Sequence, residues 1–190
     1  MIAFTRHGQT ELNRGGRLQG RMDVPLSDVG LEQAASLGRR FASEPVARVV
    51  SSPLRRACQT ADAIAAPLGL SVELDDRLVE LDYGEWDGAG LADIAATDWA
   101  AWRADPEFAP PGGERLTEVT ARIVGFLDDY RADDMIVAVS HVSPIKAAVC
   151  CALAVDERAS WRMQLAVASI TRVGHRPDGT PYLASFNELA

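Results

Sequence analysis

Apolar and polar positions along this chain follow two different periods, and they predict strands and helices in alternation. Short apolar runs that stop at polar or turn residues are typical of buried strands. Apolar residues three and four apart indicate one buried face of a helix. Strands are expected at residues 1–4, 47–51, 70–74 and 135–139, and helices at 28–41, 54–66, 91–104, 116–130 and 143–154.

The order of these elements predicts an α/β fold with a mostly parallel central sheet. A hairpin of residues 166–173 and 182–186, around the turn at 174–179, is expected to add an antiparallel edge. Residues 75–90 lose regular periodicity, and the short helix after them ends in prolines and glycines. The excursion over about 82–115 is therefore expected to form a small helical cap, within a single domain of residues 1–190.

Groups suited to phosphate chemistry follow three of the expected strands. Arg6 and His7 follow the first strand, Arg56 follows the second, and His141 follows the most hydrophobic one. Strands joined by crossover helices run parallel and end at the same edge of the sheet, so these groups are expected to converge. A neutral imidazole is a good nucleophile and a guanidinium group grips phosphate. Glu80, in the loop after the third strand, can reach the same edge and donate a proton.

Taken singly, the same residues have ordinary explanations. A strand end with two solvated polar residues accounts for Arg6 and His7, and Glu80 alone is most often a surface acid. Gly8 is expected to bring its backbone close to a ligand with the N–H free to donate. His175 is expected to be solvated in the hairpin turn.

Composition and charge narrow the class of protein. The chain has 190 residues, 47% of them hydrophobic and 24% charged, with a formal net charge of -8. An acidic chain does not suit nucleic acid or an anionic membrane, so any anion site must be a local basic pocket. No apolar run is long enough to span a bilayer, and a strand that begins at residue 2 leaves no room for a signal peptide. The three cysteines (Cys58, Cys150, Cys151) lack metal-ligand spacing and are expected to be reduced and mostly buried, in a cytoplasmic protein.

Four segments, in order, resemble the signature motifs of the histidine phosphatase superfamily, in its phosphoglycerate mutase-like branch. The first is the segment TRHGQTELN, which begins at Thr5 and contains His7. The second is SSPLRRACQTA from Ser51, the third LVELDYGEWDG from Leu78, and the fourth VSH from Val139. This resemblance implies a three-layer α/β/α sandwich and a phosphatase activity that requires neither a cofactor nor a metal.

The resemblance also implies a role for each residue of the site. His7 would be the nucleophile that becomes phosphorylated, with its other ring nitrogen donating to a backbone carbonyl. Arg56 is preferred to Arg55 because the family's arginine directly precedes an alanine. Catalytic roles are thus expected for His7, Glu80, Arg6, Arg56 and His141, and substrate-binding roles for Asn13, Gln19, Gly20 and Val142.

The chain departs from the family pattern in two places. A Gly-Glu-Ser triplet is common before the long helix, but this chain has Gly113-Glu114-Arg115, so a substrate contact or a capping hydrogen bond is expected to differ. After His141 the common glycine-rich turn is replaced by Val142-Ser143-Pro144. That form resembles small bacterial phosphatases of the broad-specificity or alpha-ribazole type, including the phosphatase half of some ribonuclease H fusions.

Three functions are compatible with these motifs. The first is a metal-independent phosphomonoesterase that hydrolyses a small phosphorylated metabolite through phosphohistidine. The second is a mutase of the phosphoglycerate mutase type, and the third is a non-catalytic phospho-ligand binder. The substrate and the oligomeric state stay open, with a homodimer among the options. The leaving-group pocket has five candidate lining residues: Arg17, Arg21, Trp86, Trp102 and Arg103.

Overall fold

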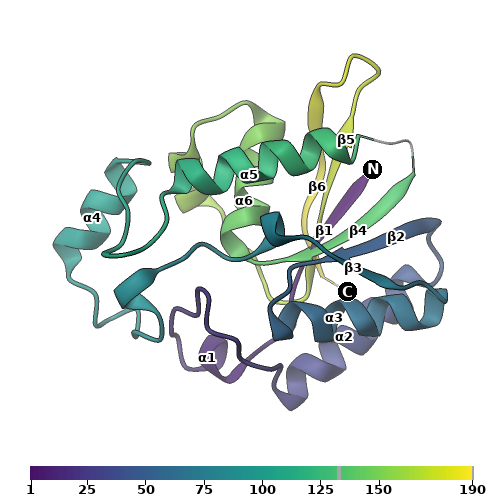
Figure 1. Ribbon diagram of the computed structural model, residues 1–190, viewed down its shortest axis with the longest axis horizontal. Coiled ribbons are helices and arrows are strands. Elements are labelled where there is room, and N and C mark those ends of the chain that lie inside the picture. Colours follow the sequence, from purple (N-terminus) through teal and green to yellow (C-terminus); the bar gives the residue numbers. More distant parts are fainter. Residues whose placement is uncertain (132–133, 190) are drawn as a thin grey trace.

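The computed structural model describes residues 1–131 and 134–189, which form a six-stranded sheet between two layers of helices (Figure 1). The strand order is β3-β2-β4-β1-β5-β6. The first four strands in this order are parallel, whereas β5 is antiparallel to both β1 and β6. The expected three-layer fold with an antiparallel edge is confirmed. The strands are β1 (Ile2–Arg6), β2 (Val46–Ser51), β3 (Val72–Leu74), β4 (Met135–Ser140), β5 (Ser169–His175) and β6 (Pro181–Leu189).

Successive residues of a strand point to opposite faces of the sheet, and two helices cover each face. Ala3 belongs to a buried cluster with Leu37 and Ile64 on one face. Phe4, the next residue, packs on the other face against Phe126, with the two ring centroids 5.9 Å apart. The first face is covered by α2 (Asp28–Phe41) and α3 (Arg55–Ala65), and the second by α5 (Leu116–Asp129) and α6 (Val142–Leu153).

The register of the central strands brings their carboxyl ends level with one another. Arg6 pairs with Ser140 between β1 and β4, and Ser51 pairs with Val139 between β2 and β4. The ladder continues one residue further, since His7 donates its backbone N–H to Ser140 at 3.1 Å. The residues that follow these strands therefore lie side by side at one edge of the sheet.

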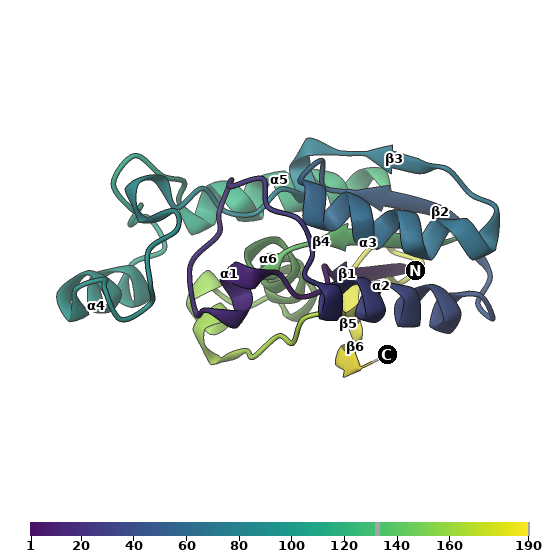
Figure 2. The same cartoon turned by 90° about the horizontal axis from the view of Figure 1, so that it is seen from below.

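The cap lies beyond this edge. In both views α4 (Ala96–Ala104) projects away from the sheet, and a short helix α1 (Glu11–Arg14) lies between them (Figures 1 and 2). An isolated bridge between Arg17 and Gly90 joins the first loop to the cap. Four 3-10 turns complete the elements in the described part of the chain: η1 (Ala66–Leu68), η2 (Asp76–Leu78), η3 (Gly84–Trp86) and η4 (Glu157–Arg162). Among the described residues no helix has the length and apolarity needed to cross a membrane.

Several predicted boundaries differ from the structure. The third strand is shorter than residues 70–74, because the η1 turn ends at Gly69 in the left-handed conformation (φ 66°). The helix expected over 91–104 begins only at Ala96, because Asp93 accepts a hydrogen bond from the Gly90 N–H and holds a turn there. Helix α6 begins at Val142, one residue before the predicted start. The sequence pattern predicted neither α1 nor η4.

His175 does not lie in the hairpin turn, so that prediction was wrong. It is the last residue of β5, paired with Pro181 of β6, and it is half-buried. The turn closes one residue later, where the Arg176 N–H donates to the Thr180 carbonyl at 2.9 Å. Burial lowers the pKa of His175.

Candidate active site

A cavity of about 560 Å³ lies between the carboxyl ends of the strands and the cap. Its volume falls within the range of small-molecule pockets, about 300–1,000 Å³. Most of the predicted site residues line it: Arg6, His7, Asn13, Gln19, Arg56, Glu80 and Val142. Gly20 and His141 are not in the lining. The convergence expected from the strand ends is therefore present.

His7 is buried, with 2% of its surface exposed, at the floor of this cavity. Its Nδ1 lies 2.7 Å from the carbonyl oxygen of Gly8, so this nitrogen carries the proton and donates it. Nε2 is then unprotonated and accepts the Nε–H of Arg56 at 3.3 Å. Burial, followed by the charges of Arg56 and Arg6, holds the pKa of His7 well below its ordinary value of 6.5. The ring is a neutral imidazole with its lone pair on Nε2.

Arg56 is completely buried beside His7. Its two terminal nitrogens donate to the backbone carbonyls of Met22 and Gly20, at 2.7 and 2.8 Å. These bonds fix the plane of the guanidinium group and leave further N–H groups for a ligand. The preceding Arg55 is exposed and contributes its backbone N–H to Asp23. The choice of Arg56 over Arg55 agrees with this difference in position.

His141 lies behind the lining, with its ring centroid 5.0 Å from that of His7. Its Nε2 is 2.8 Å from the hydroxyl of Ser52, and its buried Nδ1 has no partner among the described residues. Burial, then the charges of Arg56 and His7, hold the pKa of His141 well below 6.5. Arg6 donates to the carbonyl of Leu165 at 2.6 Å, while its buried Nε is also unpartnered in the described structure. A buried polar atom without a partner indicates a place for a ligand atom or water.

Glu80 is 5% exposed and faces the start of α6. One carboxylate oxygen accepts the backbone N–H groups of Leu81 (2.8 Å) and Ser143 (3.1 Å), and the other accepts that of Val142 (3.1 Å). The N–H groups of Val142 and Ser143 are among the first of α6, which have no intrahelical acceptor. Pro144, the next residue, has no N–H at all. The unusual Val142-Ser143-Pro144 segment thus supplies two donors that fix Glu80, and Val142 reaches the site through its backbone.

The first loop is held mostly by its own hydrogen bonds. Asn13 accepts from the Thr10 N–H at 3.1 Å, and Gln19 accepts from the Thr10 hydroxyl at 2.8 Å. Both side chains also line the cavity. Gly20 instead supports Arg56 through its carbonyl; a Cβ there would lie 1.9 Å from Asp87, and φ is +45°. Gly20 was expected at the binding surface, but in the structure it does not line the cavity and instead accepts a hydrogen bond from Arg56.

The prediction that the Gly8 N–H is free for a ligand was wrong. This N–H donates to the hydroxyl of Thr60 at 3.1 Å. A Cβ at Gly8 would lie 2.5 Å from the carbonyl oxygen of Gly30 in α2, which leaves room only for glycine. The motif glycine is therefore required for the close approach of α2 to the first loop.

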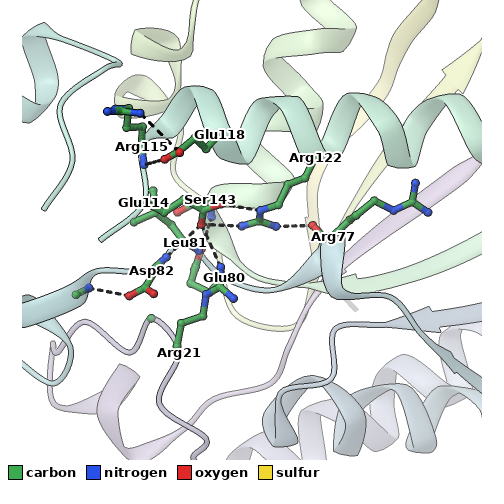
Figure 3. Close-up of polar contacts among 12 residues, drawn as sticks. Arg21, Arg77, Glu80, Leu81, Asp82, Glu114, Arg115, Glu118, Arg122 and Ser143 are labelled. Carbon is green, nitrogen blue, oxygen red and sulfur yellow. Dashed lines mark hydrogen bonds and ion pairs between the residues drawn. The ribbon is translucent and has the colours of Figure 1, made fainter. Parts of the chain in front are cut away.

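Glu114 links three segments around the site (Figure 3). Its carboxylate accepts two N–H groups of Arg122 in α5, at 3.0 and 3.3 Å, and one from Arg21 in the first loop at 3.3 Å. It also accepts the backbone N–H of Asp82, two residues after Glu80. Arg115, where the family commonly has serine, is the N-cap residue of α5, and its side chain makes no capping hydrogen bond. The Arg115 backbone N–H instead donates to the Glu118 carboxylate at 2.8 Å.

The sequence missed several cavity residues and misplaced others. Arg17 and Trp102 line the cavity as expected, whereas Arg21, Trp86 and Arg103 do not. The missed lining residues come mainly from α5, α6, η4 and the third motif: Tyr83, Thr120, Ser143, Lys146, Glu157, Ser160 and Trp161. The sequence offered one signal for Lys146: it is the single lysine among the 19 lysine and arginine residues of the chain.

The family model of the histidine phosphatase superfamily (branch 1) matches residues 2–188, nearly the whole chain. The chain belongs to this family. Known histidine phosphatases are similar to it in sequence and in structure. A bifunctional protein of Mycobacterium tuberculosis is 37% identical over 195 residues, which cover 98% of this chain and 53% of that protein. The chain thus spans about half the length of the first curated relatives it matches.

Two relatives of more similar length have names that state an activity. Phosphoserine phosphatase 1 of Hydrogenobacter thermophilus is 36% identical over 169 residues, covering 84% of this chain and 79% of that protein. The solved structure of a mycobacterial glucosyl-3-phosphoglycerate phosphatase superposes with a TM-score of 0.88 at 31% identity, covering 98% of each chain. Both names describe phosphatases of small metabolites. In this chain, residues of the first three motifs line the cavity, and His141 of the fourth motif lies behind that lining.

Proposed function

We propose that the protein is a phosphomonoesterase that hydrolyses a small phosphorylated metabolite through a phosphohistidine on Nε2 of His7. The observation that carries this proposal is the state of the His7 ring. Its Nδ1–H is held by the Gly8 carbonyl, and its Nε2 lone pair lies beside a fully buried guanidinium group. A fixed neutral imidazole next to a permanent positive charge is suited to attack on phosphorus.

The first half of the reaction transfers the phosphoryl group to the enzyme. Nε2 of His7 forms a bond to phosphorus as the ester P–O bond breaks in line, and the free N–H groups of Arg6 and Arg56 stabilise charge on the equatorial oxygens. If the Ser52 hydroxyl donates to Nε2 of His141, the proton of that ring sits on Nδ1, the atom without a partner. His141 would then donate to a phosphate oxygen.

Glu80 is the carboxyl group best placed to move the protons. It lines the cavity and is held by the start of α6. It would give a proton to the leaving alkoxide and later take one from the water that attacks phosphohistidine. That attack breaks the N–P bond, restores the neutral imidazole and releases inorganic phosphate.

The test is release of phosphate from p-nitrophenyl phosphate in the presence of a chelator, with Arg55 as the matched control. His7→Ala is expected to abolish release, and Arg56→Met to lower kcat by about 10²–10³-fold. Arg55→Met is expected to keep the wild-type rate, because that side chain is exposed. Equal rates for wild type and His7→Ala would overturn the proposal.

The role of Glu80 has a separate readout. Nitrophenolate leaves without protonation, whereas an alkoxide needs a proton. Glu80→Gln is therefore expected to slow hydrolysis of an alkyl phosphate much more than that of p-nitrophenyl phosphate. Equal losses on the two esters would contradict the acid role. Release of phosphate without any added phosphoryl acceptor would also exclude the mutase reaction as the main activity.

A further inference from the structure

Lys146 lies on α6, one helical turn beyond the residues that hold Glu80. Its side chain lines the same cavity. A helix rises 1.5 Å per residue, so Lys146 is roughly 4.5–6 Å along the axis from the N–H groups of Ser143 and Val142. The charges of Glu80 and Arg6 both act on its pKa, Glu80 raising it and Arg6 lowering it. Lys146 therefore shares the cavity with the residues of the reacting centre.

The Lys146 ammonium group has neither an ion pair nor a hydrogen bond within residues 1–131 and 134–189, although the side chain is half-buried. Burial is the largest influence on it and lowers its pKa. A desolvated charge is unfavourable unless it is paired. An anionic group of a ligand would supply the missing partner, and the partly enclosed cavity would strengthen the pairing.

Three other residues of the cavity lining add hydrogen-bond donors. The indole N–H groups of Trp102 and Trp161 and the hydroxyl of Thr120 are buried, have no partner in the described parts of the chain, and belong to side chains that line the cavity. Trp102 is only 3% exposed and packs edge-on against Trp161, with centroids 4.9 Å apart. An indole N–H can only donate. A cation together with donor groups suits a ligand rich in acceptor oxygens.

From these observations we infer that Lys146 determines specificity by binding a carboxylate on the alcohol part of the phosphomonoester. The inference rests on the proposed function and names its substrate class, the phosphate esters of hydroxy acids. Glu157 also lines the cavity, but it belongs to η4 and is not among the charges that act on Lys146. Arg17 is the other cation of the outer cavity; it is exposed and already donates to the Gly88 carbonyl at 2.8 Å. Of these two cations, Lys146 is the one without a partner among the described residues.

The kinetic test uses two esters that differ in one group. 2-Phosphoglycerate and glycerol 2-phosphate have the same skeleton, with a carboxylate in the first where the second has a hydroxymethyl group. Wild type is expected to favour 2-phosphoglycerate in kcat/KM by about tenfold to a hundredfold, mainly through KM. Lys146→Met is expected to bring the ratio close to one, and Lys146→Arg to retain most of it. An unchanged ratio in Lys146→Met, or a ratio lost in Arg17→Met instead, would overturn the inference.

A second test reads Lys146 directly and needs no turnover. Because this is the only lysine, protein labelled with ¹⁵N-lysine gives a single side-chain Nζ signal, and its pH titration reports on Lys146 alone. In His7→Ala, 2-phosphoglycerate is expected to raise the pKa of Lys146 more than glycerol 2-phosphate does. Equal shifts with the two ligands would refute the carboxylate contact. If the wild-type enzyme were inactive but the two ligands still shifted the pKa of Lys146 by different amounts, the proposed hydrolysis would be wrong and the carboxylate site would stand.

Discussion

Because two histidines are buried, we predict that the free energy of unfolding decreases when the pH falls from 7.5 to 5.5. Burial and nearby positive charges hold the pKa of His7 and of His141 well below 6.5 in the folded protein. In the unfolded chain both return to about 6.5. Below that pH the unfolded chain binds more protons than the native protein, so the free energy of unfolding falls with falling pH.

The size of the effect follows from the same linkage. Each histidine that stays neutral in the native state contributes a slope that approaches about 1.4 kcal/mol per pH unit below 6.5. Integrated from pH 7.5 to 5.5, two histidines that stay neutral in the native state remove roughly 3 kcal/mol. This is a large fraction of the roughly 5–15 kcal/mol by which a typical domain is stable. The loss is absent above the unfolded pKa and grows as the pH falls toward the folded values.

The assay is urea unfolding at pH 7.5, 6.5 and 5.5 of wild type, His7→Gln, His141→Gln and the double variant. Glutamine does not titrate, so each replacement is expected to remove about half of the pH-dependent loss. His175 and the carboxylates are present in every variant and cancel in the comparison. A double variant that loses as much stability as wild type would refute the reasoning, because the two histidines would then not be its cause.

Two further predictions concern the segment from residues 113 to 115. Glu114→Ala removes the carboxylate that pairs with Arg122 and accepts the Asp82 N–H. We expect urea unfolding to show that the free energy of unfolding falls by about 2 kcal/mol. Steady-state assays are expected to show a lower kcat, because Glu80 is displaced. A wild-type kcat would contradict the link to Glu80. Arg115→Ser gives α5 a capping hydroxyl, so we expect urea unfolding to show a free energy of unfolding that is about 1 kcal/mol higher. Arg115→Ala is the control, and no gain in stability is expected from it.

The fold and the centre of the site could be predicted from the sequence because both depend on local signals. Apolar runs located the parallel strands, and parallel strands end at the same edge of the sheet. His7, Arg56 and Glu80 could therefore be brought together without coordinates. The tautomer of His7 was also predictable in kind, since a nucleophilic imidazole needs an acceptor for its other proton, and the Gly8 carbonyl fills that role.

The outer part of the site could not be predicted in this way. Lys146 and Trp161 reach the cavity only because α6 and η4 pack beneath the cap, and no period in the sequence encodes that packing. Gly8 was misread because the sequence does not reveal that α2 approaches its backbone. The start of the cap helix was misplaced because the turn at Gly90 depends on one side-chain hydrogen bond. The homodimer and the cytoplasmic location stay predictions.

The central claim is tested most directly by trapping the phosphorylated enzyme. Wild type would be mixed with a phosphomonoester, quenched in base, and examined by ³¹P and ¹H NMR of the isolated peptide that carries phosphate. Because Nδ1 of His7 is hydrogen-bonded to the Gly8 carbonyl, we expect acid-labile phosphate on Nε2 of His7, absent from His7→Ala. Phosphate on Nδ1 or on another residue, or turnover that never passes through a phosphorylated enzyme, would contradict it.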